Sequence, residues 1–300
     1  MIISASRRTD IPAFYSEWFF DRLSKEVVYV KNPMNRKQVG QIQLTPDTVD
    51  CFVFWTKNPG PMLKKLKHLD QMGYPYFFQF TMTPYERDIE PVFTDKEEII
   101  CNFLTLSELI GKERVIWRYD PIFLNYRYTK EYHYKMFDYF CSRLSGFCDT
   151  CMISFIDIYK KIKKNMEKIS VFETDLFDME EIGIQFAKIA SAHKIQLRTC
   201  DVDCDLTPYG IVPGACIDGA LISQITGRSY PFKKDVSQRK TCRCVKSYDI
   251  GQYDTCVHYC NYCYANSSIN RVNKNYQQHC VDSDFLCDTW YGDEKITLRS

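Results

Sequence analysis

Short apolar runs alternate with longer amphipathic segments along the first two hundred residues of the chain. The short runs have the length of buried strands, and the longer segments repeat apolar residues at helical spacing. Six strand-then-helix units in succession predict parallel strands joined by right-handed crossovers. The predicted strands are residues 2–6, 49–55, 74–81, 114–119, 151–156 and 194–199.

Capping residues mark the helices predicted between these strands. Asp10 precedes the first helix as its N-cap, and Pro12 occupies its first turn. Gly73, Gly111 and Gly227 follow three of the others as C-terminal signals. The predicted helices are residues 12–23, 61–72, 94–110, 129–144, 179–193 and 217–225, and two β-branched runs, 27–30 and 39–44, are predicted as extended excursions.

This alternation predicts an α/β fold, namely a partial or complete TIM-like (β/α) barrel of about six or more parallel strands. Barrels of this kind reach the length of this chain as one unit, and 45% hydrophobic and 15% aromatic residues supply a large core. We expect the barrel in residues 1–215. A cysteine-rich segment, residues 216–300, is expected to fold over the C-terminal ends of the strands as part of one compact unit.

Polar residues follow the C-terminal end of every predicted strand. In parallel (β/α) barrels the active site is built at that end from residues of several strands, so this set predicts a site. Taken singly, each residue is also explained as a helix cap or a turn residue, as for Asp10 before Pro12 or Asp120 before Pro121. The set consists of Arg7, Arg8, Asp10, Thr56, Lys57, Asn58, Gln79, Thr81, Arg118, Asp120, Ser154, Asp157, Arg198 and Cys200.

Overall charge does not favour a particular class of partner. The chain carries 39 basic and 38 acidic residues, a formal charge of +1, which gives no overall attraction to nucleic acid or to membrane surfaces. The N-terminal residues lack a basic region followed by an apolar run, and no apolar stretch has the length of a membrane span. These features predict a soluble cytoplasmic protein, in which cysteines crowded toward one end indicate metal binding rather than disulfides.

Three cysteines in the sequence C-V-H-Y-C-N-Y-C, at positions 256, 260 and 263, have the spacing of an iron–sulfur loop. Thiolates that ligate one cuboidal cluster must converge from a tight loop, and three of them leave the fourth iron open to a small molecule. A structural zinc site and ordinary thiols are the alternatives, although zinc knuckles usually show ligands in pairs. The spacing favours a 4Fe–4S cluster bound by Cys256, Cys260 and Cys263.

A second group of cysteines, Cys200, Cys216, Cys242 and Cys244, lies close to this loop in the sequence. Four thiolates would complete the coordination of a second 4Fe–4S cluster that passes electrons to the open one. Zinc or no metal are the alternatives, and other nearby cysteines remain as substitutes. These substitutes are Cys204, Cys280 and Cys287.

Four motifs together carry a family resemblance: S-A-S-R-R-T-D at 4–10, F-W-T-K-N-P at 54–59, W-R-Y-D-P at 117–121 and the cysteine loop. Up to Asn266 the chain resembles the DUF1848 family of bacterial proteins, whose C-terminal cysteine cluster is similar to that of radical S-adenosylmethionine (SAM) enzymes. This resemblance implies that Tyr262 lies against the adenine of SAM. The chain differs from the radical SAM pattern in having its cysteine loop near the C-terminal end and in lacking Gly-Gly-Glu after the second strand, where residues 54–59 stand instead.

The first functional hypothesis is therefore a radical SAM-like enzyme that cleaves SAM to start radical chemistry on an unknown substrate. A ferredoxin or flavodoxin would supply the electron. Arg7, Arg8, Lys57 and Arg118 would hold anionic groups of SAM or substrate. Asp10, Asp120 and Asp157 would bind ribose hydroxyls or move protons. Further cofactor contacts are expected from Thr56, Asn58, Gln79, Ser154 and Arg198.

Two other classes of function compete with this hypothesis. The first is a nucleic-acid-binding or repair module stabilised by iron–sulfur or zinc. Basic residues near the cysteines support it, together with many tyrosines available for base stacking. The second is a zinc-dependent hydrolase that uses the polar strand ends. The basic residues are Lys233, Lys234, Arg239, Lys240 and Arg243.

Overall fold

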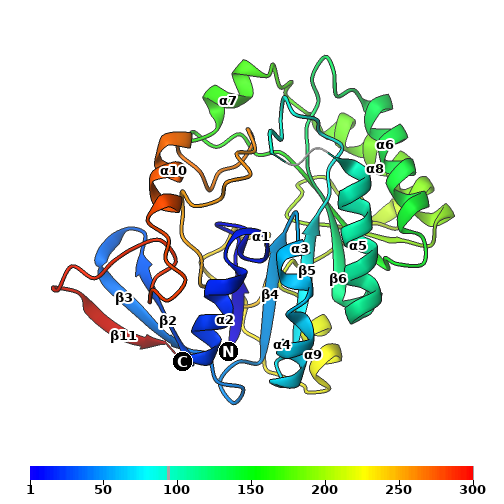
Figure 1. Ribbon diagram of the computed structural model, residues 1–300. Coiled ribbons are helices and arrows are strands. Elements are labelled where there is room, and N and C mark those ends of the chain that lie inside the picture. Colours follow the sequence, from blue (N-terminus) through cyan, green and yellow to red (C-terminus); the bar gives the residue numbers. More distant parts are fainter. Residues whose placement is uncertain (93–94, 300) are drawn as a thin grey trace.

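A computed structural model of the protein describes residues 1–92 and 95–299. Eight parallel strands form its main sheet in the order β10-β1-β4-β5-β6-β7-β8-β9 (Figure 1). Each of the six predicted strands is present in this sheet, so the α/β fold is confirmed. The strands are β1 (Ile2–Ala5), β4 (Cys51–Thr56), β5 (Tyr76–Thr81), β6 (Val115–Ile122), β7 (Thr150–Phe155), β8 (Gln196–Thr199), β9 (Val212–Pro213) and β10 (Tyr248–Asp249).

The order of the main sheet is linear, with β10 and β9 at its edges. Within residues 1–92 and 95–299 these two edge strands are not paired with each other, and barrel closure is therefore not shown. Both edge strands have only two residues and were not predicted, because a two-residue strand leaves no periodic pattern. β10 pairs in parallel with β1, so part of the cysteine-rich segment belongs to the main sheet.

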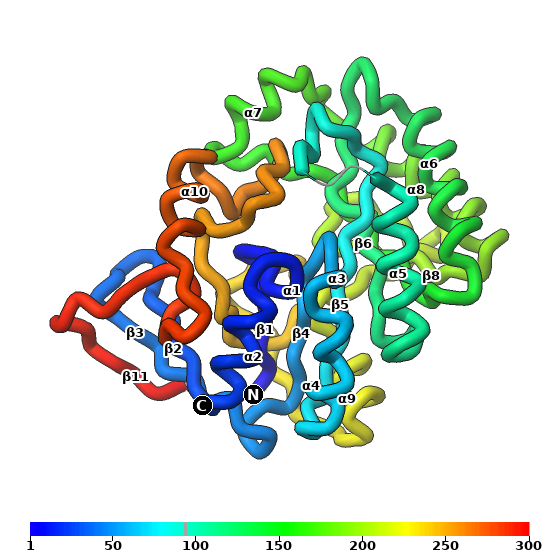
Figure 2. Tube along the Cα trace, in the orientation of Figure 1, coloured from blue at the N-terminus to red at the C-terminus, as the bar shows by residue number. Residues whose placement is uncertain are grey.

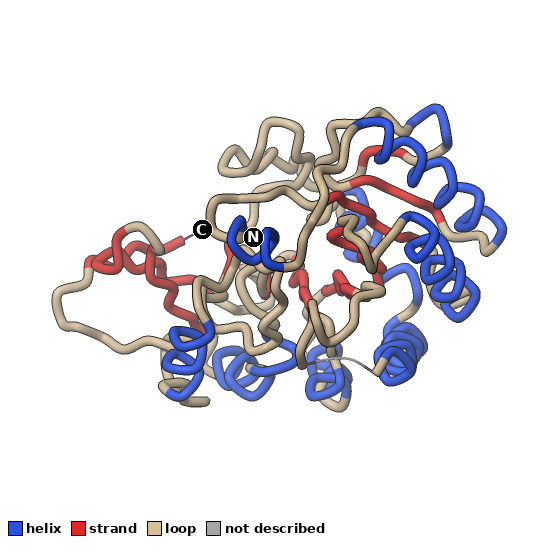
Figure 3. The backbone as a smooth tube through the Cα atoms, turned by 90° about the horizontal axis from the view of Figure 1, so that it is seen from above, coloured by secondary structure: helices blue, strands red, loops and turns tan. Residues whose placement is uncertain are grey.

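Helices follow most of the strands and cover the outer side of the curved row that the strands form (Figure 3). Helix α5 contacts strand β6, which follows it in the chain, and α8 likewise contacts β8. The helices α6 and α8 also contact each other. The helices are α1 (Ile11–Phe14), α2 (Ser16–Ser24), α3 (Gly60–Leu63), α4 (Leu66–Gln71), α5 (Lys96–Ile110), α6 (Lys130–Leu144), α7 (Lys163–Lys168), α8 (Leu176–Ala192), α9 (Gly219–Thr226) and α10 (Ile269–Gln277).

Two of the predicted helices are each interrupted. The helix expected over 12–23 divides into α1 and α2 at Tyr15, whose backbone (φ −134°, ψ 22°) leaves the helical region. The Tyr15 hydroxyl donates to the carbonyl of Thr255 at 2.6 Å, a contact from a distant part of the chain that the local pattern cannot reveal. The helix expected over 61–72 likewise divides into α3 and α4. Residue 94, the predicted start of α5, lies outside the described residues, and Asp95 caps the observed helix.

The two predicted extended excursions form a hairpin, β2 (Val27–Asn32) and β3 (Asn35–Gln43), which lies outside the main sheet. A third strand, β11 (Lys295–Arg299), pairs in parallel with β3 and completes a separate three-stranded sheet. The tube view shows how the last residues of the chain return to this hairpin near the N-terminal end (Figure 2). Neither α10 nor β11 was predicted, because both belong to a largely polar stretch.

The side chains of the main sheet alternate between two hydrophobic clusters, as the pleat of a strand requires. On β4, Phe52 and Phe54 pack into the larger cluster with the outer helices. Cys51 and Val53 point the other way, into a smaller cluster with Ile222 of α9. α9 and the segment that precedes it therefore cover part of the inner face of the sheet with apolar side chains.

No helix in residues 1–92 and 95–299 is both long and apolar enough to cross a membrane.

One buried histidine predicts a pH dependence of stability. His133 of α6 is 0% exposed; its Nε2 contacts the carbonyl oxygen of Phe123 at 3.0 Å and its Nδ1 contacts the Tyr119 hydroxyl at 2.8 Å. Burial lowers the pKa of His133 from 6.5 to about 4, so the unfolded chain binds a proton in this range that the folded chain does not. Proton binding by His133 in the unfolded chain should therefore lower the free energy of unfolding by up to about 3 kcal/mol as the pH falls from 6.5 to 4.

Thermal unfolding of the wild type and of His133→Gln, measured across this pH range, tests the assignment. The wild type should lose stability toward pH 4 while His133→Gln does not, so the difference between their melting temperatures should become smaller. His193→Gln, which replaces a surface histidine, is the matched control. An unchanged difference at every pH would contradict the assignment.

Candidate functional site

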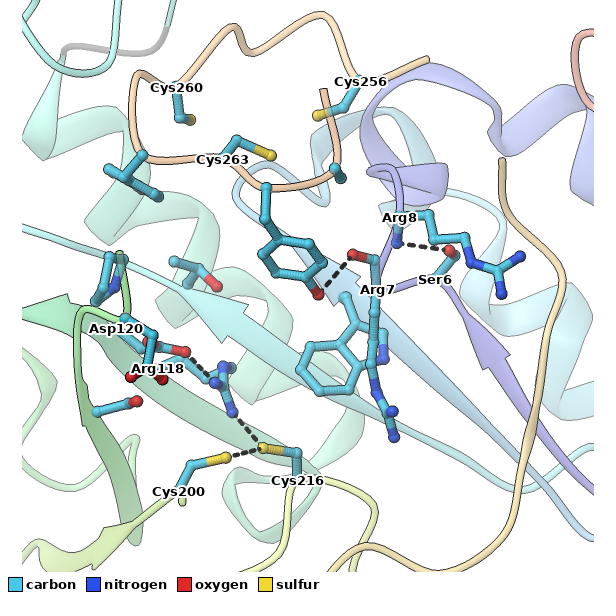
Figure 4. Close-up of a pocket in the computed structure, with 18 of the residues that line it drawn as sticks. Ser6, Arg7, Arg8, Arg118, Asp120, Cys200, Cys216, Cys256, Cys260 and Cys263 are labelled. Carbon is cyan, nitrogen blue, oxygen red and sulfur yellow. Dashed lines mark hydrogen bonds and ion pairs between the residues drawn. The ribbon is translucent and has the colours of Figure 1, made fainter. Parts of the chain in front are cut away.

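A cavity of about 590 Å³ opens at the C-terminal ends of the main-sheet strands. Its walls come from the ends of β1, β4, β5, β6, β7 and β8 on one side and from the segments around residues 237–265 on the other. Ligand sites commonly have this volume and this position in α/β proteins. Both sets of cysteines contribute to the same cavity (Figure 4).

The structure brings together most of the residues that the sequence singled out. Three predicted cofactor contacts, Asn58, Gln79 and Arg198, do not line the cavity. Asn58 instead accepts from the backbone of Gly60, and Arg198 pairs with Asp218 at 3.1 Å. The predicted residues that line the cavity are Arg7, Arg8, Asp10, Thr56, Lys57, Thr81, Arg118, Asp120, Ser154, Asp157, Cys200, Cys216, Cys242, Cys244, Cys256, Cys260, Tyr262 and Cys263.

The loop that carries Cys256, Cys260 and Cys263, here called the three-thiol loop, crosses one side of the cavity. All three thiols lie on this loop and face the cavity (Figure 4). Asn266 fixes the start of the loop by donating to the carbonyl of Cys256 at 2.7 Å, and Asn261 fixes its middle by donating to the carbonyl of Asp88 at 2.7 Å. Burial raises the pKa of Cys260 to about 12, so this thiol needs a bound cation to become a thiolate.

A buried Asp–His pair ties this loop to the first strand of the sheet. His258, between the first two cysteines, contacts Asp10 through Nε2 at 2.8 Å, and both side chains are about 5% exposed. Asp10 also accepts from the backbone of Ala13 and from that of Lys57, so it caps α1 as predicted and joins β4 as well. Sequence reasoning missed His258, although a histidine between two candidate ligands was a usable signal.

A second buried carboxylate, Glu90, holds the other end of the loop. It pairs with Lys57 at 2.8 Å, accepts from Thr83 at 2.5 Å and accepts from the hydroxyl of Tyr262. Burial opposes the charged form of Glu90, but Lys57 and Lys96 lower the pKa of its carboxyl. Lys57, which the sequence predicted as catalytic, therefore has its ammonium engaged in a buried ion pair. The ring of Tyr262 packs against that of Tyr85, with the ring centroids 5.9 Å apart.

Asp249 of the unpredicted strand β10 organises the start of the cavity wall at β1. Its carboxylate accepts from the hydroxyls of Ser4 and Ser6 at 3.0 and 2.6 Å and from the backbone of Arg7 at 2.9 Å. Arg8 extends beside it, with its guanidinium 5.0 Å from the ring of Tyr253. The local sequence around Asp249 gives no indication of this role, because its hydrogen-bond partners lie about 240 positions away in the chain.

Opposite the three-thiol loop, Arg118 of β6 reaches across the inner face of the sheet. Its Nη1 donates to the sulfur of Cys216 at 2.8 Å, and its Nη2 pairs with Asp120. Burial opposes the charge of Arg118, but Cys216 and Asp120 raise its pKa well above the ordinary value. Gln79 accepts from the same guanidinium at 3.4 Å and braces this arrangement from β5.

The remaining wall offers polar and aromatic groups to a ligand. Arg239 pairs with Asp157 at 2.5 Å and with Asp201 at 2.9 Å, closing the side of the cavity at β7 and β8. The rings of Tyr159 and Tyr264 lie 6.0 Å apart, and Tyr264 is 44% exposed. Their planes are inclined by 58°, so each ring separately offers a face on which a planar base can stack.

The three-thiol loop supplies thiols, the donors that iron–sulfur clusters take from proteins. In residues 1–92 and 95–299 no group of three or more His, Cys, Asp or Glu side chains is arranged to hold one metal ion. The three thiols line the cavity on a loop fixed at both ends, so a cluster bound by them would lie in the cavity.

Removal of the Glu90 carboxylate should destabilise the protein, because it leaves the Lys57 ammonium buried without its ion-pair partner. We expect Glu90→Gln to lower the free energy of unfolding by about 3–5 kcal/mol. The double variant Lys57→Met/Glu90→Gln should lose less than the sum of the two single variants. Thermal unfolding followed by circular dichroism measures both effects.

Glu97→Gln is the matched control for this change, because Glu97 also pairs with a basic residue, Arg143, but on the surface. Its melting temperature should stay close to that of the wild type. Equal losses in Glu90→Gln and Glu97→Gln would show that the buried pair has no special role.

Comparisons with known proteins identify the family of this chain. A family model described as Domain of unknown function (DUF1848) matches residues 2–265. No match was found among the curated proteins or among the solved structures. The matched range contains the three-thiol loop and every residue that lines the cavity. The chain therefore belongs to the DUF1848 family.

Proposed function

We propose that this protein is a radical SAM-like iron–sulfur enzyme. The observation that carries the proposal is that the three-thiol loop and the polar ends of six parallel strands line one cavity. A three-thiolate loop leaves one iron of a 4Fe–4S cluster without a protein ligand, and here that position would face the cavity. When bound and reduced, such a cluster supplies the electron that cleaves SAM into methionine and a 5′-deoxyadenosyl radical.

In this proposal the residues that line the cavity bind SAM and orient it. Arg8 is assigned to the carboxylate of SAM, because its guanidinium lines the cavity and its ion pair with Asp249 is a long one, at 3.9 Å. Asp157 and Ser154 at the end of β7 are assigned to the ribose hydroxyls. The resemblance assigns the adenine to Tyr262, but the hydroxyl of this residue is engaged by Glu90, so we assign the adenine to the exposed ring of Tyr264 instead.

The site provides no Gly-Gly-Glu segment for the amino group of SAM, and residues 54–59 stand at the end of β4 instead. The two acidic side chains of this wall do not form a pair: Asp120 lies on β6 and Asp249 on β10, four strands apart in the sheet. Asp120 is engaged by Arg118, and Asp249 by Ser4, Ser6 and the backbone of Arg7. We therefore assign no side chain to the amino group.

Cleavage of SAM tests the proposal directly. The anaerobically reconstituted protein, reduced with dithionite, should convert SAM to 5′-deoxyadenosine, detected by chromatography. Cys256→Ala, Cys260→Ala and Cys263→Ala should each abolish the product, because each removes a ligand of the cluster. Cys101→Ala, which changes an exposed thiol outside the cavity, is the matched control and should retain activity.

Absence of both SAM binding and 5′-deoxyadenosine in iron-loaded protein would overturn the SAM assignment. Stoichiometric zinc in colourless protein would favour a hydrolase instead. Iron and sulfide analysis of the same samples separates these results.

A further inference from the structure

The four thiols of Cys200, Cys216, Cys242 and Cys244, here called the four-thiol group, form a second gathering of sulfur on the inner face of the sheet. They come from three segments: one follows β8, one lies between β9 and α9, and two precede β10. The sulfurs of Cys200 and Cys216 are 2.9 Å apart, and Cys244 hydrogen-bonds with both Cys216 and Cys242. Tertiary folding therefore brings thiols up to 44 positions apart into one continuous set.

Buried donors without acceptors surround this group. Arg7 Nη2 and Trp55 Nε1 are buried and, among the described residues, have no hydrogen-bond partner. The Arg7 guanidinium lies over the Trp55 ring at 5.5 Å and interacts electrostatically with Cys244 and Cys216. An unpaired buried donor is unfavourable, so two of them indicate an acceptor that belongs at this place.

The positive charge at the group also lacks a full balance within the chain. Arg118 already donates to the sulfur of Cys216, and its charge is shared with Asp120. Arg7 has no ion-pair partner within 4.0 Å in residues 1–92 and 95–299. An anionic centre at the sulfurs would neutralise Arg7 and accept from its free N–H groups.

The segments that carry the thiols are held in place before any metal binds. Gln79 donates to the carbonyl of Cys216 at 2.7 Å, and the backbone of Ile217 donates to the sulfur of Cys244 at 3.4 Å. Asp218 then caps α9 through the backbone of Ala220 at 2.8 Å. Apolar residues of the inner cluster enclose the group on the sheet side, which excludes water.

We propose that the four-thiol group binds a second 4Fe–4S cluster. Four thiolates complete its coordination, so it carries electrons and leaves no iron open for a substrate. It would receive one electron from a one-electron carrier protein and pass one electron across the shared cavity to the cluster proposed at the three-thiol loop, with no bond made or broken. This relay role rests on the proposed function, whereas the presence of the cluster does not.

Iron and sulfide analysis of anaerobically purified variants tests the second cluster. The wild type should contain about eight irons, and the triple variant Cys256→Ala/Cys260→Ala/Cys263→Ala should retain about four, with a cluster signal in electron paramagnetic resonance after reduction. Cys216→Ser/Cys244→Ser should also retain about four and lose the other signal. Cys51→Ala, a buried thiol of the same apolar cluster, is the matched control and should keep about eight.

The triple variant decides the question even if Cys216→Ser/Cys244→Ser fails to fold. No iron in the triple variant, or stoichiometric zinc in its place, would overturn the second cluster. A retained cluster signal without SAM cleavage by the wild type would overturn the proposed function and leave the second cluster standing, so the two failures are distinguishable.

A second observation, which builds on the proposed second cluster, concerns the outer side of the four-thiol group, where Cys242 is partly exposed. It lines a second hollow together with Lys234, Lys240 and Arg243, all of which are exposed. The acidic residue of this hollow, Asp201, is paired with Arg239 at 2.9 Å, so its charge is already balanced. The segment 228–246 carries seven basic residues, and its single acidic residue, Asp235, is buried against Ser237. This exposed basic rim surrounds the thiol that lies nearest the surface.

The geometry points to this rim as the docking surface for an acidic one-electron carrier protein. Opposite charges would steer the carrier to the rim and bring its redox group close to Cys242. The same chemistry could attract nucleic acid, but the position of a redox thiol at the centre of the rim favours an electron carrier.

Stopped-flow reduction by an acidic flavodoxin measures docking. Lys234→Glu/Lys240→Glu/Arg243→Glu should lower the second-order rate constant about 10-fold at low salt, and added salt should reduce this difference. Reduction by dithionite should be unaffected. The control Lys64→Glu/Lys135→Glu/Lys188→Glu reverses three exposed charges elsewhere and should change the flavodoxin rate far less. Equal rates for the two triple variants, or loss of nucleic-acid binding alone, would overturn the docking surface.

Discussion

Two buried carboxylates hold the candidate site together. Asp10 and Glu90 are almost inaccessible to solvent, and a carboxylate in that position must have its oxygens satisfied by hydrogen bonds or ion pairs. Each takes one partner from the end of β4 and another from the three-thiol loop: Asp10 binds the Lys57 backbone and His258, and Glu90 binds the Lys57 ammonium and Tyr262. The need to satisfy these charges therefore fixes a loop near residue 260 against strands from the first hundred residues.

The parallel direction of the strands explains why the polar groups meet at the C-terminal edge of the sheet. Along β5 and β6 the inner face begins with Phe77 and Ile116, which pack with α9, and continues with Gln79 and Arg118, which face Cys216. Because all strands run in the same direction, this change from apolar to polar occurs at the same edge of the sheet. The apolar part supports the fold, and the polar part forms the cavity.

Charge compensation relates the two sets of thiols to their surroundings. Thiolates that bind a cluster bring negative charge into a buried place, where it is stable only with nearby cations or donors. Arg7 and Arg118 meet that need at the four-thiol group. Lys57 is the nearest counterpart at the three-thiol loop, since electrostatic interaction with Cys260 contributes to its raised pKa although burial opposes its charge. In the proposals above, clusters at the two sets of thiols would face one cavity and give electrons a continuous route from the basic outer rim.

The sequence by itself determined six of the eight strands of the main sheet, their parallel direction and the chemistry of their ends, because these depend on local periodicity and on residue type. It also singled out the three-thiol loop from its spacing and the four-thiol group from its closeness to that loop along the chain. Tertiary structure alone decided that Tyr15 interrupts a helix, that β10 joins the sheet beside β1, and that Asp249, Glu90 and His258 belong to the site. Those contacts join residues separated by tens to hundreds of positions, and no local pattern records which distant donor a buried carboxylate will find.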